Sequence, residues 1–567
     1  MASLLSRDVS VEGRETARAR SGSPLWHLLL MIMVGAVLPI AIAWNFGALG
    51  IPRNDDWSYL LASFRFVNGD GIDGNGWALM NLVGQLVLAW PVNLIFGNRV
   101  APLQFLVATL GVIGLVALYD LTSSLSTRRR ALFAACLLAI GPMWAALVVS
   151  FMTDIPTFSL SLICVAAGAR ALDRGHRADQ WLAVSLVAGF AGFAIRQYAI
   201  VAVVAVVLAV IWHRVDLGPR RVYRILGFGA VIMVAMAGFY WWRLGLPGFE
   251  EPPLRWPDSA MLDGALDRSM SAAILLGFLV SPALLLAGHI RLTTAALRRS
   301  RWVAVASGVS FPALCILWFK RVPGRELATM ISPGNYIKSA GILGTDVIPG
   351  NRPDVIPGFA MAMFALIGLV AISMLFVIGG SFLPRLLRVS LRSSRTASPS
   401  RTIASLALGG FCITTAAPAF LGMPLFDRYL LPVVALTTVK ILGLTSEMTP
   451  SNRLDRWGAG ISFVCLAFVG LVFAANSASF DGARWRAADR ASVIVGDRNA
   501  IDGGFEWINF HAGRQVYFSE ERLDGRYCIR MVISPDRESG WQGVVEPVWG
   551  PLRTQAWIVA EQRGPCS

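Results

Sequence analysis

The sequence predicts an all-α polytopic membrane protein with about 13 transmembrane helices and a small α/β domain at its C-terminal end. The first observation is composition: 55% of the 567 residues are hydrophobic and 15% are charged, whereas soluble domains carry about 25% charged residues. The second is that the apolar stretches are long enough to cross a bilayer. The third is that arginine-rich loops separate these stretches.

The positive charge sets an orientation. The formal net charge is +15, and Lys320, Lys338 and Lys440 are the only lysines. A strongly basic chain can bind nucleic acid, but here the arginines gather in short loops, at 128–130, 220–221, 298–299 and 385–401. Clusters of this kind between spans are typical of cytoplasmic loops. We therefore expect membrane lipid around the chain and no nucleic-acid partner.

The expected spans divide the chain into three parts. We expect residues 1–24 to form a cytoplasmic segment, residues 25–477 a transmembrane domain, and residues 478–567 an extracytoplasmic α/β domain, in a plasma (inner) membrane. An odd number of crossings places the two ends on opposite sides. The spans are expected near 26–48, 100–121, 131–150, 157–172, 180–194, 198–212, 225–243, 272–288, 302–319, 358–380, 402–420, 428–444 and 457–475.

The apolar stretch 77–97 is a special case. If it crossed the membrane, every later basic loop would lie outside, against the positive-inside rule. We therefore expect an interfacial or re-entrant helix within a first external loop that covers residues 50–99. The alternative is an ordinary transmembrane helix.

Polar motifs collect at the expected external face. They are the acidic pair Asp55-Asp56, the turn Thr153-Asp154-Ile155-Pro156, the turn at Arg196 and the run Asp427-Arg428-Tyr429. Carboxylates at a membrane boundary are costly unless they are solvated or paired. Each motif has a structural alternative: Asp154 with Pro156 is a common helix start, and the two arginines can reach lipid headgroups.

The order of these motifs resembles the GT-C glycosyltransferases that use polyprenyl-phosphate sugars. Within that class, residues 25–445 resemble the bacterial branch related to protein O-mannosyltransferases and lipid A sugar transferases. The matching features are an acidic pair, an acid followed by proline and an Arg-Tyr-x-x-Pro run, supplied by Asp55 and Asp56, by Asp154 and Pro156, and by Arg428, Tyr429 and Pro432. The His-Pro-Pro-like element of some branches is absent, and Asn75-Gly76-Trp77 stands about where it would be.

The resemblance implies transfer of a sugar from a polyprenyl-phosphate donor to the hydroxyl of a cell-envelope glycolipid, glycan or protein, with inversion. Asp55 would be the general base, since a carboxylate can take the proton of an attacking hydroxyl. Asp56 would orient the acceptor or shift the pKa of its neighbour, and Asp154 would share the catalytic site.

The leaving phosphate needs positive charge held in a fixed geometry. We expect Arg196 and Arg428, with Tyr429, to bind it. The aromatic residues Trp57, Tyr59 and Trp77 would stack on the sugar, although aromatic residues also gather at membrane interfaces for packing reasons.

Other chemistry has less support in the sequence. No histidine or cysteine cluster has metal-ligand spacing, so no metal or cofactor is expected, although a divalent ion on Asp55, Asp56 and Asp154 stays open. Two other classes of function also stay open: a transporter or flippase of lipid-linked sugars, and a non-catalytic membrane protein that binds an envelope glycan.

Two further segments, the tail and one long loop, lie outside the expected spans. In the tail we expect strands at 491–495, 527–533 and 556–560 and a helix at 501–510. Cys528 and Cys566 both lie there, where a disulfide can form. The loop 320–357 is expected to be a lid over the donor or an unstructured connector.

Overall fold

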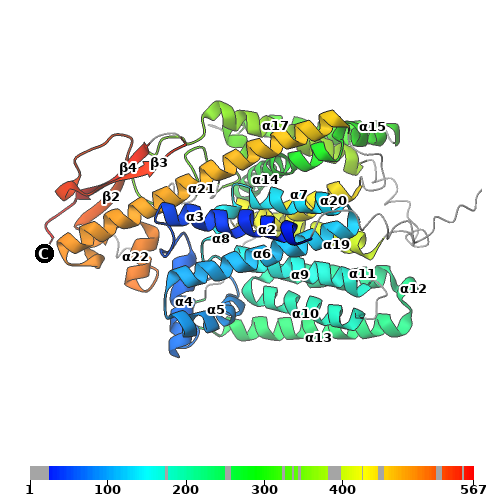
Figure 1. Cartoon of the computed structure of the whole chain (residues 1–567), viewed down its shortest axis with the longest axis horizontal. Coiled ribbons are helices and arrows are strands. Elements are labelled where there is room, and N and C mark those ends of the chain that lie inside the picture. The colour runs from blue at the N-terminus through cyan, green and yellow to red at the C-terminus, as the bar shows by residue number, and fades with distance from the viewer. Residues whose placement is uncertain are drawn as a thin grey trace, which may run out of the picture.

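The computed structural model describes residues 24–172, 177–249, 257–299, 301–321, 326–334, 337–342, 347–380, 398–423, 425–444, 452–518, 526–551 and 554–566. The expected cytoplasmic segment, residues 1–24, lies outside this part of the chain except for Pro24. Most of the described chain is a bundle of helices that run roughly along the long axis of the molecule, with a small sheet at one end (Figure 1).

Within the described residues, nine helical segments are long and apolar enough to cross a membrane. They are α2 (Pro24–Ile32), continued through a π-helical turn (Met33–Val37) into α3 (Leu38–Asn45), α6 (Val100–Leu125), α9 (Asp154–Leu172), α10 (Ala178–Ile195), α13 (Pro219–Leu244), α14 (Ser259–Leu286), α17 (Gly358–Gly380), α19 (Pro399–Phe420) and α21 (Arg453–Val495). The prediction of a polytopic all-α membrane protein is confirmed.

The four remaining expected spans coincide with other helices. These are α7 (Arg128–Ala139) with α8 (Trp144–Val148), α11 (Ile200–Trp212), α16 (Arg301–Arg321) and α20 (Leu431–Leu444). Short connecting helices are α12 (Arg214–Leu217) and α15 (His289–Arg299). Between α7 and α8 lies Pro142, which disfavours helix at the preceding residue. Irregular backbone therefore interrupts the bundle, as it does where α11 and α20 each follow a 3₁₀ turn.

The first loop folds into two helices, α4 (Asp56–Asn68) and α5 (Val83–Phe96). α5 has 14 residues, fewer than the ~20 that a crossing helix needs. One of its faces is apolar and exposed, through Val87, Trp90, Leu94, Ile95 and Phe96. A short helix with such a face fits the interfacial placement expected for residues 77–97.

A single helix joins the membrane bundle to the C-terminal domain. α21 has 43 residues and runs without interruption from Arg453 to Val495. The expected domain boundary at 477/478 therefore falls inside a helix. The expected strand 491–495 is wrong, because these apolar residues form the last turn of α21 instead.

The C-terminal domain contains a four-stranded sheet with the order β1-β2-β4-β3 and one helix, α22 (Phe505–Ala512). β1 pairs with β2 in parallel, and the other pairs are antiparallel. The strands are β1 (Ile501–Asp502), β2 (Ile529–Ser534), β3 (Val545–Trp549) and β4 (Thr554–Gln562). The expected strands at 527–533 and 556–560 are thus confirmed as β2 and β4, and the expected helix is α22. Cys528 and Cys566 form a disulfide.

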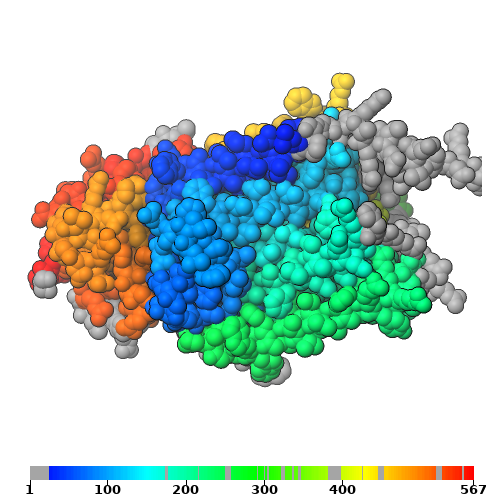
Figure 2. All heavy atoms as spheres, turned by 60° about the horizontal axis from the view of Figure 1, so that its bottom comes forward, coloured from blue at the N-terminus to red at the C-terminus, as the bar shows by residue number. Residues whose placement is uncertain are grey.

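Two loops pack against this domain. Trp57 of the first loop belongs to the domain's buried core, together with Trp507 and Ile533. From the loop 320–357, the backbone of Pro349 accepts a hydrogen bond from Ile533, and Arg352 donates one to Asn476 of α21. The first loop and the domain lie directly against each other on the molecular surface (Figure 2). All three segments therefore share one end of the bundle.

Candidate functional site

Four charged side chains from distant parts of the sequence form a chain of alternating sign. Arg428 donates a hydrogen bond from Nη2 to Oδ2 of Asp55 at 3.0 Å, and its Nε lies 3.8 Å from Oδ1 of Asp154. The same Asp154 oxygen accepts a hydrogen bond from Nη1 of Arg196 at 2.9 Å. We call Asp55, Asp154, Arg196 and Arg428 the membrane-side cluster.

Helix ends place each member of the cluster. Asp55 precedes α4 at the N-cap position, but its carboxylate does not cap the helix. Asp154 is the first residue of α9, and Arg196 follows the last residue of α10 in extended conformation. Arg428 lies in the 3₁₀ turn before α20. Side chains at helix ends can converge where a continuous helix would direct them to different faces.

The cluster is almost completely buried. The exposed fractions are 1% for Asp154, 4% for Arg196 and 3% for Arg428, whereas the Asp55 side chain is 14% exposed. Buried charges are costly unless they are paired, and the two arginines balance the two aspartates. Oδ2 of Asp154 and Nε of Arg196 have no hydrogen-bond partner among the described residues. The cluster is thus electrically balanced, and it can be reached from outside at Asp55.

Aromatic rings enclose the two arginines. The Tyr429 ring centroid lies 5.1 Å from the Arg196 guanidinium and 5.5 Å from that of Arg428. Tyr198 packs against Arg196, and Phe426 against Arg428. Rings in these positions limit the orientations that a guanidinium can take. Tyr429, expected at the phosphate site, therefore lies with both of the arginines expected there.

Asp56 has a different environment from its neighbour. It is fully buried and accepts hydrogen bonds from the backbone N–H groups of Arg53 and Phe151, at 2.5 and 2.9 Å. Burial raises the pKa of Asp56 well above its usual range, and the two backbone hydrogen bonds oppose this shift. The carboxylate fastens the first loop to the turn before Asp154. It offers no exposed surface to an acceptor.

The three expected sugar-stacking rings are also unlike one another. Trp77 is half-buried, donates a hydrogen bond from Nε1 to Oδ1 of Asp55 at 3.2 Å and stacks on Phe518. Trp57 and Tyr59 are 0% and 1% exposed, so neither ring has a face open to a sugar in this structure. Of the three, Trp77 alone combines partial exposure with contact to the cluster.

Sequence reasoning assigned no role to Asp427, which adjoins the cluster. It is fully buried and accepts hydrogen bonds from the backbone N–H groups of Ile337 and Arg428, at 2.6 and 2.9 Å. Asp427 thereby links the loop 320–357 to the turn that carries Arg428. In the sequence, only its position next to Arg428 could have indicated a role for Asp427. Its partner on the loop is a backbone N–H, which leaves no trace in the sequence.

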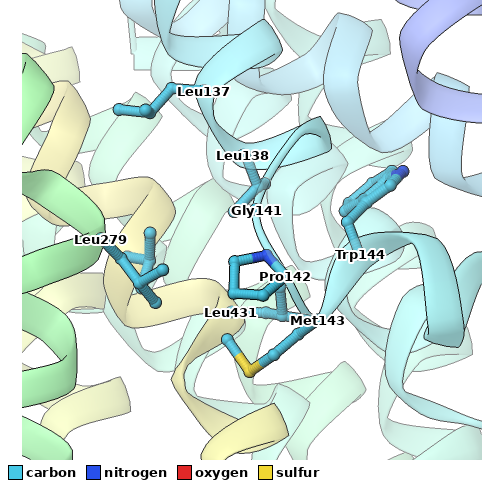
Figure 3. A pocket seen from close by; sticks show the side chains of 9 residues that line it. Leu137, Leu138, Gly141, Pro142, Met143, Trp144, Leu279 and Leu431 are labelled. Carbon is cyan, nitrogen blue, oxygen red and sulfur yellow. The ribbon is translucent and has the colours of Figure 1, made fainter. Parts of the chain in front are cut away.

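Neither a metal site nor an apolar pocket among the described residues contributes to this cluster. No group of three or more histidine, cysteine, aspartate or glutamate side chains there could hold a metal ion. An apolar pocket (Figure 3) is lined by Leu137, Leu138, Gly141, Pro142, Met143, Trp144, Leu279, Leu431 and Val434. None of these side chains carries a charge, and none belongs to the membrane-side cluster.

Together these features define a multi-pass membrane protein with a buried charged site where the bundle meets the C-terminal domain. A family model described as dolichyl-phosphate-mannose-protein mannosyltransferase matches residues 84–242. The matched part includes Asp154 and Arg196. For that part of the chain, the match confirms the resemblance to polyprenyl-phosphate-dependent glycosyltransferases. No curated protein matches the sequence.

Solved structures give further similarities. The apo oligosaccharyltransferase of Archaeoglobus fulgidus is 16% identical, with a TM-score of 0.44 over 82% of this chain and 58% of its own. The chain thus spans less than two thirds of that protein. AglB from the same organism, in complex with an inhibitory peptide and a dolichol-phosphate, is 14% identical, with a TM-score of 0.42 over 90% and 69%. ArnT from Cupriavidus metallidurans bound to undecaprenyl phosphate is 13% identical, with a TM-score of 0.38 over 96% and 100%.

Proposed function

We propose that this protein is a GT-C-type membrane glycosyltransferase that moves a sugar from a polyprenyl-phosphate donor to an acceptor hydroxyl, with inversion at the anomeric carbon. The observation that carries the proposal is the membrane-side cluster: two buried arginines beside two carboxylates, one of which solvent can reach. Arginines suit the phosphate of the donor, and a carboxylate suits the proton of the acceptor. The family match over residues 84–242 supports the same reaction class.

Donor binding would exchange one anion for another. In the structure Arg428 pairs with Asp55 at 3.0 Å. A lipid phosphate that binds Arg428 and Arg196 replaces Asp55 as the partner of Arg428. Asp154 keeps both guanidinium groups in place, since it lies within 3.8 Å of each. The Asp55 carboxylate is then available to a hydroxyl.

The chemical step follows from this arrangement. The acceptor hydroxyl attacks the anomeric carbon and gives its proton to Asp55. The bond between the anomeric carbon and the phosphate oxygen breaks, and the electron pair leaves with the polyprenyl phosphate, whose negative charge the arginines stabilise. One displacement inverts the configuration of the sugar. Trp77, which contacts Asp55, would lie beside the sugar ring or the acceptor, which is a glycolipid, a glycan or a protein.

We also propose that the site faces away from the cytoplasm. The basic residues Arg128, Arg220 and Arg401 begin or adjoin helices at the bundle end opposite the C-terminal domain (Figure 1), and such residues favour the cytoplasmic side. An impermeant maleimide should label Asp70→Cys on intact cells, and Ser124→Cys only after permeabilisation. Both positions are exposed. The reverse labelling pattern would overturn the orientation.

The function is tested by sugar transfer. Purified protein is given polyprenyl-phosphate sugars, beginning with mannose, and a cell-envelope extract, and labelled products are identified by mass spectrometry. We expect a glycosylated acceptor and free polyprenyl phosphate in equal amounts. A protein that binds such donors without releasing polyprenyl phosphate would instead be a receptor. One that moves them across vesicle membranes without transfer would be a transporter.

A further inference from the structure

The residues immediately before Asp55 are held by the C-terminal domain and by the helix that leads into it. Arg53 donates hydrogen bonds to Asp481 from Nε and to Ser477 from Nη2, both at 2.8 Å. The backbone N–H of Asn54 donates to Oε1 of Glu506 at 2.9 Å. The general base proposed above therefore follows two residues that are fixed from outside the membrane bundle.

These contacts belong to a second group of buried charges, which we call the domain-side cluster: Arg53, Asp481, Arg484 and Glu506. Arg484 lies 2.7 Å from Oε2 of Glu506 and 3.7 Å from Oδ1 of Asp481. All four residues are at most 2% exposed. An ion-pair network of this kind holds its members in one geometry, since the loss of one partner leaves a buried charge unpaired.

The backbone at Asn54 shows why such support is needed. Asn54 has φ of +56°, in the left-handed region that non-glycine residues adopt only at an energetic cost. The hydrogen bond from its N–H to Glu506 fixes this turn, and the turn directs Asp55 toward Arg428. If the hydrogen bond were lost, the turn could relax and the carboxylate would move.

The same domain holds the other partner of Asp55. The Trp77 ring, whose Nε1 donates to Asp55, packs against Phe505 at 5.2 Å and Phe518 at 5.8 Å between ring centroids. Phe505 precedes Glu506 in α22. One short helix thus supports both the backbone before Asp55 and the indole that contacts its carboxylate.

We infer that Glu506, with Asp481, is a positioning residue for sugar transfer: it sets the location of the Asp55 carboxylate through Asn54 without touching either substrate. The inference rests on the proposed role of Asp55 as the base. Because a displacement of 1 Å at a reacting group can cost on the order of 10²-fold in rate, a residue so far from the reaction can control it.

The test compares Glu506 with a matched acid in the same domain. Glu506→Ala should lower kcat by about 10-fold or more, while the donor KM changes less than about twofold, since neither phosphate-binding arginine contacts Glu506 among the described residues. Glu506→Gln should restore most of the rate, because its amide oxygen still accepts from Asn54. The control is Glu546→Ala. Glu546 is also buried and pairs with Arg486 and Arg490, and its loss should leave kcat unchanged.

Equal kcat losses in Glu506→Ala and Glu546→Ala would overturn the inference, as would an unchanged kcat in Glu506→Ala. If Glu506→Ala does not fold, Glu506→Asp provides the same comparison, because it retracts the carboxylate and keeps the charge. Hydrogen exchange of the peptide around residues 51–58 needs no transfer activity. The Asn54 amide should exchange faster in Glu506→Ala than in wild type or Glu546→Ala. Unchanged protection of the Asn54 amide would refute the positioning role, whether or not the wild type transfers sugar. Absence of sugar transfer by the wild type would count against the proposed function and not against the positioning role.

Discussion

The domain-side cluster and the membrane-side cluster lie on either side of Asn54 and contain the same residue types, but they differ in their exposure to solvent. The domain-side cluster joins two acids and two arginines that are all at most 2% exposed. The membrane-side cluster also joins two acids and two arginines, but the Asp55 side chain is 14% exposed, and Tyr429 and Trp77 beside it are half-buried. Solvent reaches one cluster and not the other.

Exposure therefore distinguishes a cluster that holds the structure in place from a cluster that can bind a substrate, whereas charge does not. A buried, paired cluster can specify geometry, but a substrate cannot enter it without unfolding the surroundings. A cluster that is open at one carboxylate can exchange a protein partner for a ligand. Adjacent residues can therefore have opposite roles, as we propose for Asp55 and Asp56.

The sharpest test of this contrast is the acidic pair. Asp55→Asn should leave the protein folded and lower transfer by on the order of 10²–10⁴-fold, because an amide cannot serve as the base. Asp56→Asn should instead lower thermal stability by about 1–3 kcal/mol, because the amide cannot accept both backbone hydrogen bonds. Transfer rates and melting curves of the two variants check this. A wild-type rate in Asp55→Asn would exclude it as the base.

The next largest effect is expected at the arginines. Arg428→Ala and Arg196→Ala should each weaken donor binding by about 1.5–3 kcal/mol, the usual contribution of a hydrogen bond to a charged group. Lysine at either position should restore only part of this, since it lacks the planar fork of arginine. Titration with an unreactive polyprenyl phosphate measures the affinity. If both alanine variants bind as tightly as wild type, the phosphate lies elsewhere.

The positions of the helices could be predicted from the sequence better than the contacts between them. Hydropathy predicts all nine of the helical segments among the described residues that are long and apolar enough to cross a membrane, since a bilayer imposes its thickness on each span. Asp154, Arg196 and Arg428 stand out in the sequence because each lies in a polar motif that is expected at the same membrane face. Their contacts with one another and with Asp55 could not be derived from the sequence, because they form only when four separate segments pack together.

The misses have the same physical cause. Trp57 and Tyr59 are expected to stack on the sugar, but Trp57 is buried in the core of the C-terminal domain and Tyr59 in the core of the helical bundle. The apolar run at 491–495 suits a strand as well as a helix, and the continuation of α21 decides it. Glu506 carries no local motif, since its partner is a backbone N–H more than 400 residues away.

A smaller effect on transfer is expected from the disulfide. Replacement of Cys528 and Cys566 by serine removes a cross-link across 38 residues and should destabilise the C-terminal domain by about 2–4 kcal/mol. Donor binding should stay at the wild-type level, because the arginines belong to the membrane bundle. Limited proteolysis and donor titration of the double variant measure the two quantities. A large loss of donor affinity would show that the C-terminal domain also supports the phosphate-binding arginines.

The smallest effect is expected at Trp77. Trp77→Phe keeps an aromatic ring against Phe505 but removes the N–H donor to Asp55, a hydrogen bond to a charged group. We expect kcat to fall less than in Glu506→Ala, with the protein as stable as wild type. Steady-state kinetics on both variants gives the order. The reverse order would make the indole, rather than the backbone of Asn54, the main support of the base.

The unbroken path of α21 has a consequence for how this protein can vary in length. A helix turns by about 100° and rises about 1.5 Å with each residue. One inserted or deleted residue just before Ser477 would therefore rotate Asp481 and Arg484 away from Arg53 and displace the whole C-terminal domain relative to the bundle. Changes of about seven residues, close to two turns, would restore the rotation but raise the domain by about 10 Å. Both the rotation and the rise of α21 therefore fix the position of the C-terminal domain relative to the bundle. We expect insertions and deletions in related chains to fall outside α21.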